Sequence, residues 1–264
     1  MNDEKEFRTA ERTIWTPFTR LDILTILAEG SPDRTAAVRH KLNRGLRMFR
    51  SVVRLPHAGP SVMAVGAFSE ASVCVTRGDE AFISARIDDL PTTESPSALQ
   101  DVANALCIDL GVLPLRIAHD SNPDFTSTRF ARNLGVPTVA VHPHHALAAA
   151  IAAEHGVDSP LLALTLDAEG AVILRVDGPT FEGLGRHEEG AAALGAWAVQ
   201  AAEATGLHHI ALSATGVFDT ASMSLLADYL SAHGLSPLTC RNGLTEGQCL
   251  SLGQAWVALQ TAEL

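Results

Sequence analysis

Three histidines stand close together in the middle of the chain, and their spacing limits the chemistry they can share. His142, His144 and His145 are separated by one, two and three positions, with Pro143 among them. A metal ion held on one helix face needs imidazoles four residues apart, because that spacing places both rings on one side. His142 and His145 could share a metal only with adjustment, so the start of a helix is the favoured interpretation.

A carboxylate at the end of an apolar segment is a second candidate for chemistry. Asp167 follows the segment 161–166, and Glu169 and Gly170 come next in a predicted turn. A carboxylate in this position can hold a metal ion or a water molecule, or it can start a turn through its side-chain oxygen. Both alternatives remain open for Asp167.

A polar loop between a predicted strand and a predicted helix is the third candidate. It contains His119, Asp120 and Asp124. Asp124 is predicted to be the N-cap of a helix at 124–134, because its side chain can accept a hydrogen bond from the first helical turn. Arg129 lies one turn into this helix, where it could reach an anion or pair with an acid.

The elements that position these residues follow one order twice. Predicted helices end at Gly111 and Gly135 in the first half and at Gly206 and Gly234 in the second, each just before an apolar strand. The repeat has an offset of about 95 to 100 residues. Two copies of this α/β unit predict the duplicated fold of actin-like and sugar-kinase-like ATPases, with two lobes that are each a mixed sheet with helices.

The first lobe is predicted to begin with three short strands. These are 62–68, 72–77 and 81–87, and Gly78 with Asp79 indicates a turn between the last two. In the predicted fold the first hairpin of each lobe faces the cleft between the lobes. Its turn residues are therefore expected to contact phosphate groups.

We expect three parts along the chain: a helical and basic appendage at 1–55, a first lobe at 56–143 and a second lobe at 144–264. The arginines and the lysine between Arg34 and Arg54 could form a docking arm for anions. A solvated linker or helix face is the favoured interpretation.

Composition excludes several function classes. The chain has 264 residues, 47% of them hydrophobic, and a formal net charge of −11, which argues against nucleic acid as the main partner. No apolar run approaches the roughly 20 residues of a membrane span, and the charged start predicts a cytoplasmic protein without a secretory signal. The four cysteines lack C-x-x-C spacing, so they are expected to be buried small hydrophobes rather than a zinc knuckle or a redox dithiol.

Several separated segments of the chain resemble one known protein family. Residues 119–129 read H-D-S-N-P-D-F-T-S-T-R, which resembles the H-D-x-H-P-D-Y-x-S-T-R signature of the HypF carbamoyltransferases, the hydrogenase maturation proteins. Further segments match in order between about residues 40 and 260: 65–67, 135–137, 144–146, 153–156, 216–218 and 252–254. The resemblance implies the same duplicated ATPase fold and transfer of a carbamoyl group from carbamoyl-adenylate to a partner's C-terminal cysteine. It marks five residues as candidates for ligand binding: His119, Asp120, Arg129, Gly170 and Gly216.

Departures from the family pattern fall on its metal and nucleotide motifs. The two family metal histidines are replaced by Pro143 and Leu147, and the family motif D-G-T-G reads D-A-E-G at 167–170. The family's late metal aspartate is lost unless Glu246 substitutes for it after a one-residue slip. By resemblance, Asp167 and Glu246 are the candidate catalytic residues and His142, His145 and Asp167 the candidate metal ligands.

Two hypotheses follow from the resemblance and its departures. The first is a non-catalytic partner or scaffold in nickel–iron hydrogenase maturation, which pairs with itself, with a full-length HypF-like relative or with another maturation protein. The second is a minimal enzyme that uses Asp167 and Glu246 with ATP or carbamoyl-adenylate and a divalent metal. Residues 191–202, which include Trp197, are nearly all apolar, so we expect this helix to need a second covering surface and favour a dimer.

Overall fold

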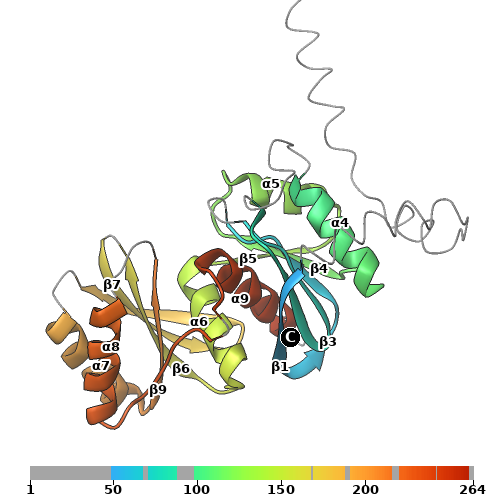
Figure 1. The fold of residues 1–264 in the computed structure, drawn as a ribbon. Coiled ribbons are helices and arrows are strands. Elements are labelled where there is room, and N and C mark those ends of the chain that lie inside the picture. The colour runs from blue at the N-terminus through green and yellow to red at the C-terminus, as the bar shows by residue number, and fades with distance from the viewer. Residues whose placement is uncertain are drawn as a thin grey trace, which may run out of the picture.

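The structure is a computed structural model that describes residues 49–67, 71–87, 98–167, 169–187, 191–215, 220–241 and 243–261. Two five-stranded sheets with helices against both faces form two lobes (Figure 1). Within the described residues no helix is long and apolar enough to cross a membrane. Most of the predicted basic appendage and Gly216 lie outside the described residues.

The sheet of the first lobe combines parallel and antiparallel strands. Its strands are β1 (Phe49–Gly59), β2 (Val62–Ala64), β3 (Cys74–Ser84), β4 (Arg116–Asp120) and β5 (Thr138–Val141). The spatial order is β1-β3-β2-β4-β5, in which β2, β4 and β5 are parallel and β3 runs antiparallel to both its neighbours.

The sheet of the second lobe repeats this plan. Its strands are β6 (Leu161–Asp167), β7 (Gly170–Asp177), β8 (Thr180–His187), β9 (His209–Ala214) and β10 (Ser236–Leu238). The order β8-β7-β6-β9-β10 matches the first sheet position by position. The predicted duplication is confirmed, except that the edge strand β8 follows β7 in sequence whereas its counterpart β1 precedes β2.

Because β1 is an edge strand of the first sheet and pairs with β3, two predictions are wrong. The turn predicted at Gly78 and Asp79 is absent, because β3 continues through both residues and pairs with β1. Gly78 adopts a positive φ of 62° opposite Gly59, next to a register shift, so the strand bends there without reversing. The boundary predicted at residue 55 lies inside β1, where Arg54 forms an exposed ion pair with Asp79 at 3.0 Å.

Four helices cover the outer faces of the two sheets. They are α4 (Ala98–Leu110), α5 (Thr126–Asn133), α7 (Ala191–Thr205) and α8 (Thr220–Ala232). Side chains of α4 and α5 share a core with the first sheet, and side chains of α7 and α8 share a core with the second. The second cover expected for α7 is therefore α8: Gly195 of α7 lies so close to Tyr229 that an added Cβ would be 2.5 Å from its ring. Helix α8 thus covers part of α7 within the same chain, and the dimer stays a prediction.

The two remaining helices join the lobes. Helix α6 (Pro143–His155) ends the first half of the chain but packs on the second sheet, and α9 (Glu246–Thr261) ends the second half but packs on the first. They lie side by side between the sheets (Figure 1). A Cβ at Gly253 would overlap the carbonyl oxygen of Ala146, so the two backbones are in direct contact.

Candidate functional site

The histidine cluster forms the first turn of α6, which confirms the favoured interpretation. His142 is the N-cap, and its Nδ1 accepts a hydrogen bond from the backbone N–H of His144 at 3.3 Å. Pro143 occupies the first helical turn, where its missing N–H costs nothing. One ring nitrogen of His142 is therefore used to begin the helix.

His145 is buried and hydrogen-bonded to the turn between β7 and β8. Its ring is 2% exposed, and Nε2 donates to the carbonyl oxygen of Gly178 in the turn between β7 and β8 at 3.0 Å. Burial lowers the pKa of His145, so the ring is neutral at neutral pH. The histidine in contact with Asp167 is His144, whose Nε2 lies 3.6 Å from Asp167 Oδ2; the grouping of His145 with Asp167 stays a prediction.

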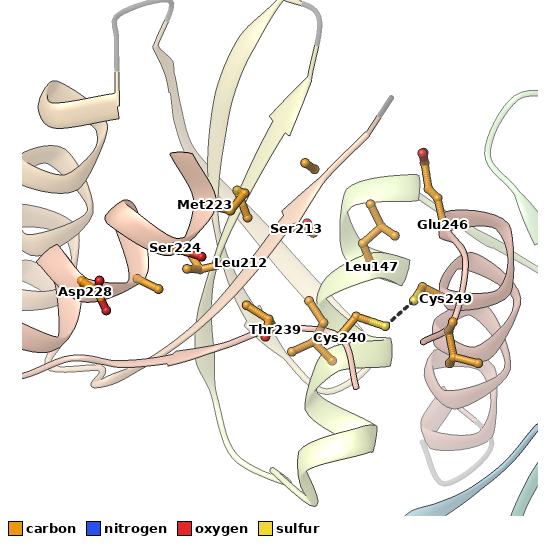
Figure 2. Close-up of a pocket in the computed structure, with 14 residues that line it drawn as sticks. Leu147, Leu212, Ser213, Met223, Ser224, Asp228, Thr239, Cys240, Glu246 and Cys249 are labelled. Atoms are coloured by element: carbon orange, nitrogen blue, oxygen red, sulfur yellow. Dashed lines mark hydrogen bonds between the residues drawn. The ribbon is translucent and has the colours of Figure 1, made fainter. Parts of the chain in front are cut away.

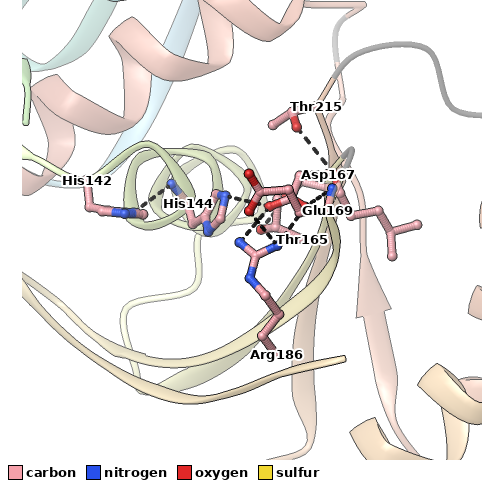
Figure 3. A network of polar contacts seen from close by, with 9 residues as sticks. His142, His144, Thr165, Asp167, Glu169, Arg186 and Thr215 are labelled. Atoms are coloured by element: carbon pink, nitrogen blue, oxygen red, sulfur yellow. Dashed lines mark hydrogen bonds and ion pairs between the residues drawn. The ribbon is translucent and has the colours of Figure 1, made fainter. Parts of the chain in front are cut away.

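Asp167 is paired with an arginine that the sequence analysis did not single out (Figure 3). Arg186 Nη1 and Nη2 donate to its two carboxylate oxygens at 2.8 and 2.9 Å. Oδ1 also accepts the backbone N–H of Glu169 at 2.9 Å, so Asp167 does start the predicted turn. These hydrogen bonds, chiefly from Arg186, hold the pKa of Asp167 below its usual range.

Strand register explains why Arg186 reaches this carboxylate. In the β6–β7–β8 meander Thr165 pairs with Val172, which pairs in turn with Arg186. Residues directly opposite one another point to the same face of a sheet, and so do residues two apart on one strand. Thr165, Asp167 and Arg186 therefore share a face, and this alternation was the signal available in the sequence.

These residues do not suit the divalent metal that the family resemblance implies. Pro143 and Leu147 offer no donor, and Arg186 already occupies both oxygens of Asp167. No group of three or more His, Cys, Asp or Glu side chains that could hold a metal ion occurs in the part of the chain that the structure describes.

The polar loop after β4 is built around buried groups. His119 and Asp120 are each 1% exposed, and His119 Nδ1 donates to the Asp120 carbonyl at 2.6 Å. Asp120 Oδ1 accepts the N–H of Asn122 at 2.8 Å. Its buried Oδ2 accepts no hydrogen bond from the described residues, which leaves one acceptor on this loop open to a ligand.

Two predictions for this loop need correction or completion. Asp124 is exposed and is not the N-cap, because α5 begins at Thr126 with Phe125 in the cap position and no side-chain cap bond. The chain turns one residue later than predicted, and the Asp124 N–H is bound by Asn122 instead. Arg129 donates to the Asp124 carbonyl at 2.9 Å and is exposed.

A cavity of about 560 Å³ lies between α6, α8, β9 and the start of α9 (Figure 2). Its polar lining includes Ser213, Asp228 and Glu246, and Cys240 and Cys249 meet at its wall. The candidate catalytic acids therefore belong to different places: Glu246 to this cavity and Asp167 to the ion-paired network. Gly170, with φ of 126°, pairs with Asp167 across the hairpin.

The comparison with known families addresses the first half of the chain. Residues 57–154 match the family model described as the HypF Kae1-like domain. The resemblance of this chain to the HypF-like carbamoyltransferases is therefore confirmed. Two curated HypF-like relatives agree: carbamoyltransferase HypF2 of Cupriavidus necator is 43% identical over 150 residues, and carbamoyltransferase HypF of Rhizobium leguminosarum bv. viciae is 43% identical over 112 residues.

The matches cover about half of this chain but only a small part of each HypF relative. The matches take in 52% and 42% of this chain but only 19% and 15% of the relatives, so the chain spans under a fifth of their length. Among solved structures, full-length HypF in a phosphate- and nucleotide-bound form superposes with a TM-score of 0.72 at 16% identity, over 81% of this chain and 58% of that one. A hexokinase of the ROK family from Thermus thermophilus has a TM-score of 0.50 at 14% identity, over 75% and 97% of the two chains. These likenesses establish the duplicated ATPase fold.

Proposed function

We propose that this HypF-like chain is a non-catalytic partner or scaffold in nickel–iron hydrogenase maturation. The observation that carries the proposal is the pair formed by Asp167 and Arg186. The Arg186 guanidinium stays charged throughout the physiological pH range. Because Arg186 is part of β8, this positive charge is a fixed partner of the Asp167 carboxylate. A divalent metal ion would have to displace it against direct charge repulsion.

The surrounding donors support the same conclusion. His142 uses Nδ1 to begin α6, and His145 uses Nε2 on the Gly178 carbonyl. Each ring keeps a second nitrogen, which can ligate a metal only if it is aimed at the other ligands of that metal. The histidine in contact with Asp167 is His144, at 3.6 Å, which supports a role that does not depend on a metal held by His142 and His145.

A minimal enzyme that uses Asp167 and Glu246 is the second candidate. The cavity favours it, because about 560 Å³ is within the range of small-molecule sites and Glu246 and Asp228 line the wall. The placement of Asp167 outside this wall counts against a joint role for the two acids. A cavity that binds a nucleotide without turnover is compatible with the first proposal as well.

Association with a HypF-type enzyme tests the proposed partner role. The full chain and a full-length HypF carbamoyltransferase would be mixed at tens of micromolar and followed by sedimentation velocity and light scattering. We expect a complex of defined stoichiometry with HypF or a homodimer of the chain. A clean monomer that also leaves the sedimentation of HypF unchanged would contradict the proposal.

A further inference from the structure

Two thiols meet at the wall of the cavity described above. Cys240 follows β10, Cys249 lies in the first turns of α9, and their sulfur atoms are 2.8 Å apart (Figure 2). Cys240 is exposed, whereas Cys249 is only 5% exposed. The expectation that all four cysteines are buried small hydrophobes is therefore wrong for Cys240, and the lack of C-x-x-C spacing concealed a pair that the fold assembles.

The other two cysteines have the inert character predicted for them. Cys74 and Cys107 are both buried in the first lobe. Burial raises the pKa of Cys107 to about 12 and raises that of Cys74 as well, so neither forms a thiolate at neutral pH. They are internal controls for any reaction of the pair.

We propose that Cys240 and Cys249 form a reversible disulfide that fastens the end of β10 to α9 beside the cavity. The oxidant is a small-molecule disulfide such as oxidised glutathione. The Cys240 thiolate attacks one glutathione sulfur, the glutathione S–S bond breaks, and one glutathione thiolate leaves. The Cys249 thiolate then attacks the Cys240 sulfur, the protein S–S bond forms, and the second glutathione thiolate leaves. Two protein thiols are oxidised, one disulfide is reduced to two thiols, and the two protons pass to solvent and the leaving thiolates.

The arrangement suits this order of events. Cys240 is the sulfur that a solvent-borne disulfide can reach, and the second step needs no solvent access because Cys249 is already in contact. A protein disulfide has sulfurs about 2.05 Å apart, so the pair must close by less than an ångström. The hydrogen bond with Cys249, burial and the charge of Glu154 raise the pKa of Cys240, which makes the first step slow at neutral pH.

The position of the bond gives it a structural consequence. β10 is one of the two edge strands of the second sheet, while α9 packs on the first sheet and against α6. A disulfide between their ends would join the two lobes at the cavity wall. The inference holds whether or not the chain acts as a scaffold in maturation.

Mass spectrometry after a glutathione titration tests the proposal on the full chain. Trypsin cuts after Arg186 and Arg241, which places Cys240 in peptide 187–241 and Cys249 in peptide 242–264. After long incubation with oxidised glutathione we expect these peptides to be linked, free thiols to fall from four to two, and dithiothreitol to reverse both changes. We also expect the oxidised protein to melt about 5 °C higher, because a short loop has been closed.

Three variants separate a true pair from adventitious oxidation. Cys249→Ser should hold one glutathione on Cys240, Cys240→Ser should stay unmodified, and the control Cys107→Ser should form the linked peptides as wild type does. Wild type that keeps glutathione on Cys240 without linked peptides would overturn the proposal. So would covalent dimers through Cys240, an unreactive pair, or linked peptides with no change in melting temperature.

Discussion

At the scale of single residues, the contact that changes the chemistry of the site is the one between Arg186 and Asp167. The carboxylate receives two hydrogen bonds from Arg186 and one from the Glu169 backbone, and its pKa is lowered chiefly for that reason. A carboxyl group with a lowered pKa in the folded state binds fewer protons there than when unfolded. It stabilises the fold above its ordinary pKa, and this contribution is lost as the pH falls through the folded-state value.

Arg186→Gln should therefore lower the free energy of unfolding by about 1 kcal/mol at neutral pH, a typical value for a partly exposed ion pair. When urea unfolding is repeated at lower pH, the difference from wild type should begin to shrink below about pH 4, the ordinary pKa of an aspartate, and should be lost once the pH falls below the lowered folded-state pKa of Asp167. Arg175→Gln is the matched control, because Arg175 pairs with Asp177 on the same sheet in a more exposed setting. An Arg186→Gln effect that does not change with pH would show that the pair is not its cause.

Asp124 allows a second test at the scale of single residues, in which we expect almost no change in the free energy of unfolding. Its side chain is exposed and caps no helix, and its hydrogen bonds to Asn122 and Arg129 use backbone atoms that alanine keeps. Asp124→Ala should change the free energy of unfolding by less than about 0.5 kcal/mol, whereas loss of a true N-cap costs about 1 kcal/mol. A fall in melting temperature of several degrees would restore the capping interpretation.

At the scale of elements, the contact between α6 and α9 holds the lobes together. Gly253→Ala would place a methyl group on the Ala146 carbonyl and force the helices apart, at a cost of about 3 kcal/mol. Gly183→Ala is the control, because nothing lies within 4 Å of its added methyl group. Chemical unfolding of both variants measures the difference, and equal stabilities would contradict the close crossing.

The elements also show what could be predicted from sequence. Apolar runs that end at Gly111, Gly135, Gly206 and Gly234 reveal the duplication, because local periodicity and helix-ending glycines mark it. The continuous β3 could not be predicted, since Gly78 beside Asp79 has the local chemistry of a turn and only pairing with β1 makes it a bend. The contacts of Arg186 with Asp167 and of Cys240 with Cys249 could not be predicted for the same reason. They depend on strand register and helix packing, and no local motif marks either residue.

At the scale of the whole molecule, the chain has the two-lobed ATPase fold and a cavity, while Pro143 and Leu147 stand where the HypF resemblance implies metal-binding histidines. Helices α6 and α9 cross from one lobe to the other, so neither half of the sequence makes a complete lobe alone. The two halves of the sequence therefore form one folded unit. The proposed loss of catalysis rests on a few side chains around Asp167.

Metal and ATP analysis of the purified chain tests this central claim most directly. The full chain would be incubated with zinc or ferrous iron and ATP, freed of excess ligand, and measured for bound metal and released phosphate, with a full-length HypF carbamoyltransferase as the positive control. We expect that neither metal binds in stoichiometric amount and that ATP turnover stays at background, in wild type and in Asp167→Asn alike. Stoichiometric metal together with ATP turnover that Asp167→Asn abolishes would contradict it.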